Sequence, residues 1–74
     1  MKKIIATILC FCIEWHLPLL VSIELLGLAR IALDIEHSFQ DRCYYLLLEY
    51  AALDETWDVT ISNKILGKFN LETI

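Results

Sequence analysis

The residues of this chain best suited to chemistry are an aspartate and a histidine three positions apart. Asp34 and His37 have the spacing that places a carboxylate and an imidazole on one helix face, as in the Glu-x-x-His helices of di-iron bundles, and Asp41 continues that face. Those bundles need two such motifs and several carboxylates, whereas this chain supplies one motif, with Arg30 on the same stripe. The pattern therefore predicts a solvated polar stripe with weak ion pairs, and no metal site.

The three cysteines offer a second kind of chemistry, as nucleophiles or in disulfides. A nucleophilic thiol would need a histidine beside it, but Cys43 lies six residues from His37, which on a helix is roughly 120° out of register. Cys10 and Cys12 lie within an apolar run, and three thiols cannot all pair within one chain. We interpret all three as small apolar packing residues.

No other motif indicates catalysis, a cofactor or nucleic-acid binding. The two glycines, Gly27 and Gly67, stand alone, so the chain has no glycine-rich phosphate loop. Six scattered bases against ten acids give a net charge of −4, which disfavours nucleic acid as a partner. We therefore predict a protein that is not an enzyme and that has no cofactor and no small-molecule substrate.

The composition is too apolar for a small domain that stands alone. Hydrophobic residues make up 58% of the 74 residues, against roughly 45–50% in typical soluble domains. A domain of this size buries only about 60% of the surface that its unfolded chain exposes. We expect residues 1–74 to form one helical unit that covers its apolar side chains with lipid or with another protein chain.

The first predicted element is a short apolar helix within residues 1–18. A long uncharged run favours a helix from about Lys3 to Trp15. Pro18 should interrupt it, because the proline ring clashes with the carbonyl four residues earlier and disfavours helical geometry in the preceding residue. A second helix is expected to begin near Leu19; the alternative is one helix kinked at Pro18.

The same segment carries signals of a membrane contact. Lys2 and Lys3 begin it like a signal sequence, but no small-residue cleavage site follows the apolar run. Its averaged hydropathy would pass for a transmembrane span of about 20 residues. Glu14 and His16 lie near the middle of that span, where an acid costs up to about 3 kcal/mol, so insertion is marginal. We predict membrane association through the N-terminal third, by a span or by a peripheral contact, with a cytoplasmic location as the alternative.

Residues 19–53 are predicted to form one long amphipathic helix, because apolar residues recur there at steps of three or four. The polar stretch before Phe39 would also suit a hairpin turn, but it contains no glycine or proline, which favours a continuous helix. We predict that the apolar row of this helix is an interface with a second copy or with a helical partner. The row comprises Leu28, Ala32, Ile35, Phe39, Cys43, Leu46, Tyr50 and Leu53.

Residues 54–74 suit two structures. Asp54 or Thr56 could cap a short helix whose apolar residues recur every four positions and which ends near Gly67. Alternating apolar and polar residues in the first half of the segment would also suit a β-hairpin. We favour the helix.

These elements together predict an all-α fold: a short apolar N-terminal helix, a break near Pro18, a long amphipathic helix and a short C-terminal helix or hairpin. The first functional hypothesis is a small helical protein that associates with a membrane through its N-terminal third and engages itself or a partner through the long helix. The second is a soluble helical module that dimerises or binds a partner. A reading frame without a selected function is the third.

Overall fold

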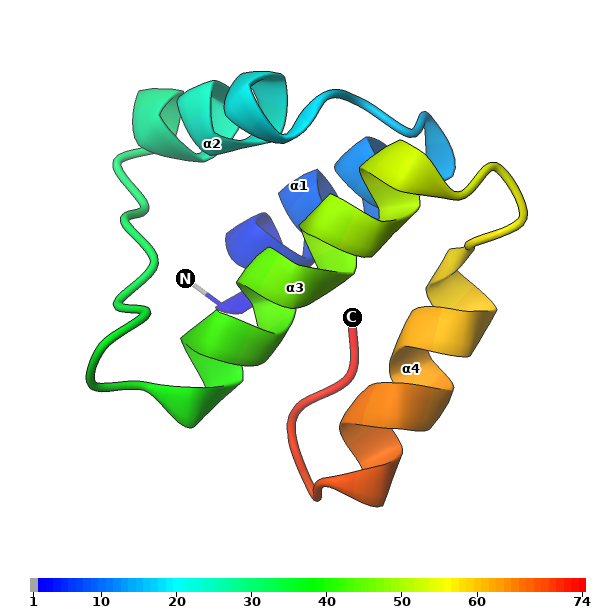
Figure 1. Ribbon diagram of the computed structural model, residues 1–74. Helices are drawn as coiled ribbons and strands as arrows, with labels where there is room; N and C mark the ends of the chain where they lie inside the picture. The colour runs from blue at the N-terminus through cyan, green and yellow to red at the C-terminus, as the bar shows by residue number, and fades with distance from the viewer. Residues whose placement is uncertain (1) are drawn as a thin grey trace.

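Residues 2–74, which the computed structural model describes apart from the side chains of Lys2 and Lys3, form four helices and no strands. The helices are α1 (Lys2–Glu14), α2 (Leu19–Leu28), α3 (Phe39–Leu53) and α4 (Val59–Lys68) (Figure 1). The all-α class, the break near Pro18 and the helical C-terminal segment are thus confirmed, and the β-hairpin alternative is wrong. Within this described part of the chain, every helix is too short or too polar to cross a bilayer.

The single long helix predicted over residues 19–53 is wrong. α2 ends at Leu28, residues 29–38 form an irregular connection, and α3 begins only at Phe39. The polar stretch before Phe39 is therefore a turn, as in the alternative to a continuous helix. The apolar row predicted along one helix face is consequently divided among two helices and the connection between them.

A left-handed residue ends α2. Arg30 has a φ of 60°, which lets its N–H donate to the carbonyl of Gly27 and lets the N–H of Ile31 donate to the carbonyl of Leu26, both at 2.9 Å. This pair of bonds is the Schellman motif, which satisfies carbonyls at the end of a helix and usually has glycine at the left-handed position. Arginine is uncommon there, so the sequence pattern gave no sign of the helix end.

The same motif ends two further helices. His16, with a φ of 51°, follows α1, and Asn70, with a φ of 56°, follows α4. The N–H of Leu17 donates to the carbonyl of Cys12 at 3.1 Å, and the N–H of Leu71 donates to the carbonyl of Leu66 at 2.9 Å. In all three motifs the residue after the left-handed one is apolar and packs against the core, so each helix end also directs the chain inward.

Side chains cap the starts of α3 and α4. Ser38 Oγ accepts the N–H of Asp41 at 3.1 Å, and Asp58 Oδ1 accepts the N–H of Ile61 at 2.8 Å. The predicted caps Asp54 and Thr56 are wrong for α4. Asp54 instead accepts from the N–H and the hydroxyl of Thr56, at 2.9 and 2.6 Å, in the turn that precedes α4.

The four helices fall into two consecutive pairs, α1–α2 and α3–α4, and the second helices of these pairs, α2 and α4, repeat the same pattern. α2 and α4 have ten residues each and begin 40 residues apart. Each contains a serine, a leucine and a glycine at the same places, in Ser-Ile-Glu-Leu-Leu-Gly (22–27) and Ser-Asn-Lys-Ile-Leu-Gly (62–67). The matching serines and leucines are all buried: Ser22 and Leu26 in α2, and Ser62 and Leu66 in α4.

The first helices, α1 and α3, match with an offset of 39 residues. Leu9 and Cys12 of α1 correspond to Leu48 and Ala51 of α3, and all four are buried. The connection between α3 and α4 is one residue longer than that between α1 and α2, which accounts for the change of offset. The chain is therefore a tandem repeat of one helical hairpin, α1–α2 followed by α3–α4.

The two hairpins pack reciprocally. α1 and α3 lie side by side and run in the same direction (Figure 1), and each second helix packs against the first helix of the other hairpin, α2 against α3 and α4 against α1. Two hydrogen bonds also cross between them. His16 Nδ1 donates to the carbonyl of Ala51 at 2.7 Å, and the N–H of Val59 donates to Glu14 Oε1 at 3.2 Å. The buried core at this junction comprises Leu9, Cys12, Ile13, Leu26, Tyr44, Leu47, Leu48, Ala51 and Leu66.

The last residues pack back onto the second hairpin. Leu71 and Ile74 contact the core. The amide side chain of Asn63 bonds both the carbonyl and the N–H of Ile74, at 2.9 and 2.8 Å. The hydroxyl of Tyr44 donates to the carbonyl of Glu72 at 3.2 Å. These bonds hold the segment after α4 against α3 and α4.

Candidate functional site

The aspartates and the histidine considered for metal binding come together in a turn, not on a helix face. The N–H and the ring Nδ1 of His37 both lie 3.1 Å from Asp34 Oδ1, and the N–H of Asp34 donates to Asp41 Oδ2 at 2.9 Å. The side chains of His37 and Asp34 are 78% and 54% exposed. The structure describes no group of three or more histidine, cysteine or acidic side chains placed to hold a metal ion. These contacts shape the turn before α3.

The cysteines are free thiols in apolar surroundings. Cys12 is buried in the core, and Cys10 and Cys43 are half-buried. Burial, and then the negative charge of Glu14, raises the pKa of the Cys10 thiol above its ordinary value, which makes the reactive thiolate scarcer. Cys43 lines a groove between α3 and α4, whereas the ring of His37 bonds Asp34 in the exposed turn. The arrangement favours packing roles for the thiols.

The predicted interface row is distributed over three parts of the fold. Leu28 ends α2, and Ala32 and Ile35 lie in the connection 29–38. The remaining members belong to α3: Phe39, Cys43, Leu46, Tyr50 and Leu53. All of these α3 residues except Leu53 line one groove. Leu53, which is 81% exposed, lies at the mouth of a different hollow with His16 and Pro18.

We call this hollow between α3 and α4 the α3–α4 groove; it has a volume of about 200 Å³. An aromatic pair lies at each end: Phe39 and Phe69 meet edge to face with centroids 5.7 Å apart, and Tyr50 and Trp57 stack at 5.3 Å. These pairs join the helices at their ends and leave the middle open. The lining residues are Phe39, Cys43, Leu46, Leu47, Tyr50, Ile65 and Phe69.

A second apolar surface lies on the first hairpin, at α2. The inner side of α2 is buried at Ser22 and Leu26, but its outer side is also apolar, with Leu20 77% and Leu28 82% exposed. Glu24, between Leu20 and Leu28 on this outer side, is the one charged residue of α2, and a helix with so much exposed apolar surface is normally covered. This feature is readable in the sequence from residue 19 to residue 28, yet the predicted interface row includes only Leu28 of this surface.

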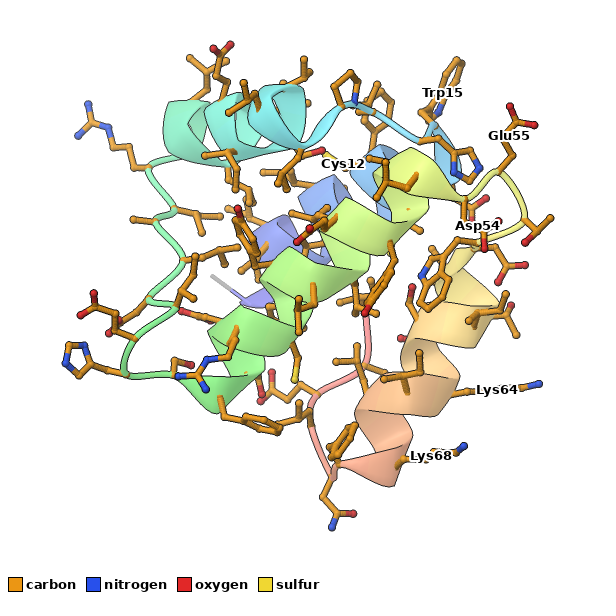
Figure 2. All side chains as sticks on the ribbon, in the orientation of Figure 1. Cys12, Trp15, Asp54, Glu55, Lys64 and Lys68 are labelled. Atoms are coloured by element: carbon orange, nitrogen blue, oxygen red, sulfur yellow. The ribbon has the colours of Figure 1, made fainter. Side chains whose placement is uncertain are left out.

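Phe11 of α1 and Trp15, the residue after this helix, extend this surface. Phe11 and Trp15 stack with ring centroids 5.8 Å apart and are 51% and 69% exposed. The ring of Trp15 projects from the same edge of the molecule as α2 (Figure 2). Apolar hollows of about 420 and 430 Å³ adjoin α2 on its α1 and α3 sides. We define the α2 face as Phe11, Trp15, Leu20, Val21 and Leu28.

The repeat provides an internal comparison for the α2 face. Its five positions correspond, by the offsets of the two hairpins, to Tyr50, Asp54, Thr60, Ile61 and Lys68. Three of these counterparts are polar or charged, and Tyr50 carries a hydroxyl group. Three of the five positions that are apolar in the first hairpin are thus polar or charged in the second, whereas Ile61 stays apolar and Tyr50 lines the α3–α4 groove.

Charge also differs between the hairpins. Up to Arg30, the chain carries three bases against the acids Glu14 and Glu24, a net charge of +1. The rest carries three bases against eight acids, a net charge of −5, which together give the −4 of the whole chain. The apolar α2 face therefore lies in the part of the chain that has a net positive charge, which an anionic surface does not repel.

Comparisons of this chain with protein families, with curated proteins and with solved structures found no match.

Proposed function

We propose that this chain is a small non-enzymatic helical protein that attaches peripherally to a membrane surface through the α2 face. The observation that carries the proposal is the contrast within the repeat. Leu20 and Leu28 are largely exposed at places where α4 has Thr60 and Lys68. An apolar patch of this kind on a small protein marks a contact surface.

A lipid surface suits the chemistry of this face. Tryptophan is enriched at membrane–water interfaces, where its ring is apolar on its body and polar at its N–H, and Trp15 is 69% exposed. Exposed Glu24 on α2 favours a shallow contact, with the carboxylate kept among headgroups and water. The net charge of +1 on this part of the chain suits anionic lipid better than the −5 of the remainder.

Sedimentation with lipid vesicles tests the proposal. We expect the protein to co-sediment with vesicles containing anionic lipid, and less with purely zwitterionic ones. Binding should shift the tryptophan emission to shorter wavelength, because Trp15 enters a less polar environment. The shift should disappear in Trp15→Phe, since Trp57 is packed against Tyr50 and lies outside the α2 face.

The repeat supplies the variant for this test. Leu20→Thr with Leu28→Lys places in α2 the residues that α4 carries at the same positions, so the fold should persist. Losing about 1.5 kcal/mol of apolar transfer per leucine, at the low end for such side chains, outweighs the roughly 1 kcal/mol that the added lysine gains near anionic lipid, so binding weakens about 30-fold. The mirror variant, Thr60→Leu with Lys68→Leu, should strengthen binding by creating a second apolar face.

The alternative occupants of the α2 face give different results. If the protein ignores vesicles but forms oligomers that the double leucine variant dissociates, the face binds protein and the membrane proposal is wrong. Vesicle binding that the variant leaves unchanged would likewise contradict it.

A further inference from the structure

The charge of α2 lies in the middle of its exposed apolar side. Glu24 follows Leu20 by four residues and precedes Leu28 by four, so the three side chains form one stripe along the helix. Leu20 and Leu28 are largely exposed, and Glu24 is exposed as well. At a rise of about 1.5 Å per residue, the stripe is about 12 Å long. A single carboxylate therefore divides an otherwise continuous apolar stripe.

The matching stripe of α4 has a different composition. Its residues are Thr60, Lys64 and Lys68. The two lysines extend from α4 away from the rest of the molecule (Figure 2). This stripe keeps at least one charge and a hydroxyl group when any one of its residues is neutralised. In α2, by contrast, the neutralisation of one carboxylate leaves no charge on the helix.

Among the described side chains, none compensates the charge of Glu24, which has no hydrogen bond or ion pair with them. α1 and α3 pack against α2, and no charged residue lines the two apolar hollows on these sides of α2. His16 and Glu49 line a separate hollow at the start of α2, and Arg30 follows its end. The carboxylate of Glu24 is therefore balanced by water alone.

The other charged groups of the described elements around α2 are placed elsewhere. Glu36 is exposed in the connection 29–38. The rest bond partners outside α2: Glu14 the N–H of Val59, Asp41 the N–H of Asp34, His37 the carboxylate of Asp34, and Arg42 the carbonyl of Ile35. Protonation of Glu24 thus breaks no contact of the fold.

The charge of Glu24 opposes the membrane contact proposed above. An anionic surface repels a carboxylate, and surroundings poorer in water disfavour its charged form. Both costs are removed when the carboxylate takes up a proton. We propose that acid pH strengthens the attachment of this chain to anionic membranes, because protonation of Glu24 completes the apolar stripe of α2. This inference rests on the proposed function and adds a regulation of the same face.

Linkage gives the direction of the effect. Since the neutral form of Glu24 binds lipid more tightly than the charged form, membrane contact and proton uptake favour each other. The negative potential of an anionic surface also concentrates protons there. Carboxyl groups of glutamate in water titrate near pH 4.3, and both effects move the change at the membrane to higher pH. Binding therefore strengthens as the pH falls from about 7 to about 5.

Flotation with anionic vesicles near pH 7 and near pH 5 tests the proposal. Flotation separates lipid-bound protein from protein that aggregates as its net charge falls. Glu24→Gln keeps the size of the side chain and removes its charge at both pH values. Near pH 7 this variant should bind about fivefold more tightly than the native protein, because one repelled charge is absent. Near pH 5 the two proteins should bind alike.

Glu36→Gln is the matched control. Glu36 lies near the end of the connection 29–38, outside the α2 face, and its substitution changes the net charge by the same amount. This variant should bind within about twofold of the native protein at both pH values. His16 also gains charge in this pH range, but it does so in all three proteins and cancels in the comparison. Circular dichroism checks that both variants keep the native helix content.

The possible outcomes separate this inference from the membrane proposal. If acidification strengthens the native protein and Glu24→Gln equally, Glu24 has no part in the response, although the membrane contact stands. Tighter binding of Glu36→Gln, equal to that of Glu24→Gln, would also overturn the inference, because net charge alone would then explain it. If none of the three proteins binds vesicles at either pH, the membrane proposal is wrong and this inference is wrong with it.

Discussion

Ser22 and Ser62 occupy the same position in the two halves of the repeat and are both fully buried, but only the side-chain hydroxyl of Ser62 has hydrogen-bond partners among the described residues. Ser62 Oγ accepts from Trp57 Nε1 at 2.9 Å and donates to the carbonyl of Asp58 at 3.0 Å. Ser22 Oγ has no partner among the described residues. The counterpart of Trp57 in the first hairpin is Leu17, which has no side-chain donor. Each hairpin thus buries a serine at this position, but only in the second hairpin does the serine hydroxyl form hydrogen bonds.

Alanine at these two positions should have opposite consequences. Ser62→Ala leaves the indole N–H of Trp57 without its acceptor and should lower the free energy of unfolding by about 1–3 kcal/mol. Ser22→Ala removes a buried hydroxyl without a partner, so stability should be unchanged or higher by up to about 1 kcal/mol. Urea unfolding of the two variants measures the difference. Equal losses at both sites would show that Ser22 has a partner in solution.

Glycine at the left-handed helix ends gives a second matched pair. Arg30 and Asn70 have φ values of 60° and 56° in the same motif. Left-handed geometry costs an ordinary residue about 1–2 kcal/mol, and asparagine tolerates it better than arginine does. Glycine loses more conformational entropy on folding than other residues do, which offsets part of this gain. Arg30→Gly should therefore raise the melting temperature by a few degrees, and Asn70→Gly should change it less. A larger gain for Asn70→Gly would contradict this ranking.

Helical periodicity predicted those helices whose ends are marked by familiar sequence signals, such as a proline or a change from apolar to polar residues. The uncharged run and Pro18 were sufficient to place α1, the break and the start of α2. The helical C-terminal segment also followed from spacing, although its cap proved to be Asp58. Arg30 shows where this approach fails: spacing of three and four continues through residues 29–38, but a left-handed arginine supported by tertiary packing ends the helix there.

The repeat was readable in the sequence but was not inferred from it. Its clearest trace is the pair of segments 22–27 and 62–67, which share a serine, a leucine and a glycine at the same spacing. The remaining matches are of burial and backbone geometry, such as Leu9 with Leu48, and appear only in the folded chain.

Of the predicted interface row, only four of the members in α3 lie beside one another. Phe39, Cys43, Leu46 and Tyr50 share the α3–α4 groove because one helix carries them. Leu28 lies beyond the irregular connection, where the helical phase no longer applies, and belongs to the α2 face. The function of both surfaces remains a prediction.

Glu14 should contribute to stability by joining the two hairpins. Its carboxylate accepts the N–H of Val59 at the start of α4, where a negative charge is favourable. Glu14→Ala should lower the free energy of unfolding by about 0.5–1 kcal/mol. Glu24→Ala removes an exposed acid from α2 and is the matched control, with an expected change within about 0.5 kcal/mol. Equal effects in urea unfolding would mean that the contact of Glu14 with α4 adds nothing.

Tyr44 should make the fold sensitive to alkaline pH. Burial, and then the negative charges of Glu72 and Asp41, raises the pKa of Tyr44 above its ordinary value of about 10. The folded protein therefore holds this proton at a pH where the unfolded chain has released it. The stabilisation is complete below about pH 10 and is lost as the pH rises through the folded-state pKa.

Tyr44→Phe separates this effect from other alkaline transitions. The variant should lose the hydrogen bond to the Glu72 carbonyl and start less stable near pH 7, by about 1 kcal/mol. Its stability should then fall less between pH 9.5 and 11 than that of the native protein, because phenylalanine releases no proton. The raised pKa of Cys10 acts in both proteins from about pH 9 and cancels in the comparison. Parallel curves of unfolding free energy against pH would show that Tyr44 ionises as freely in the folded chain as in the unfolded one.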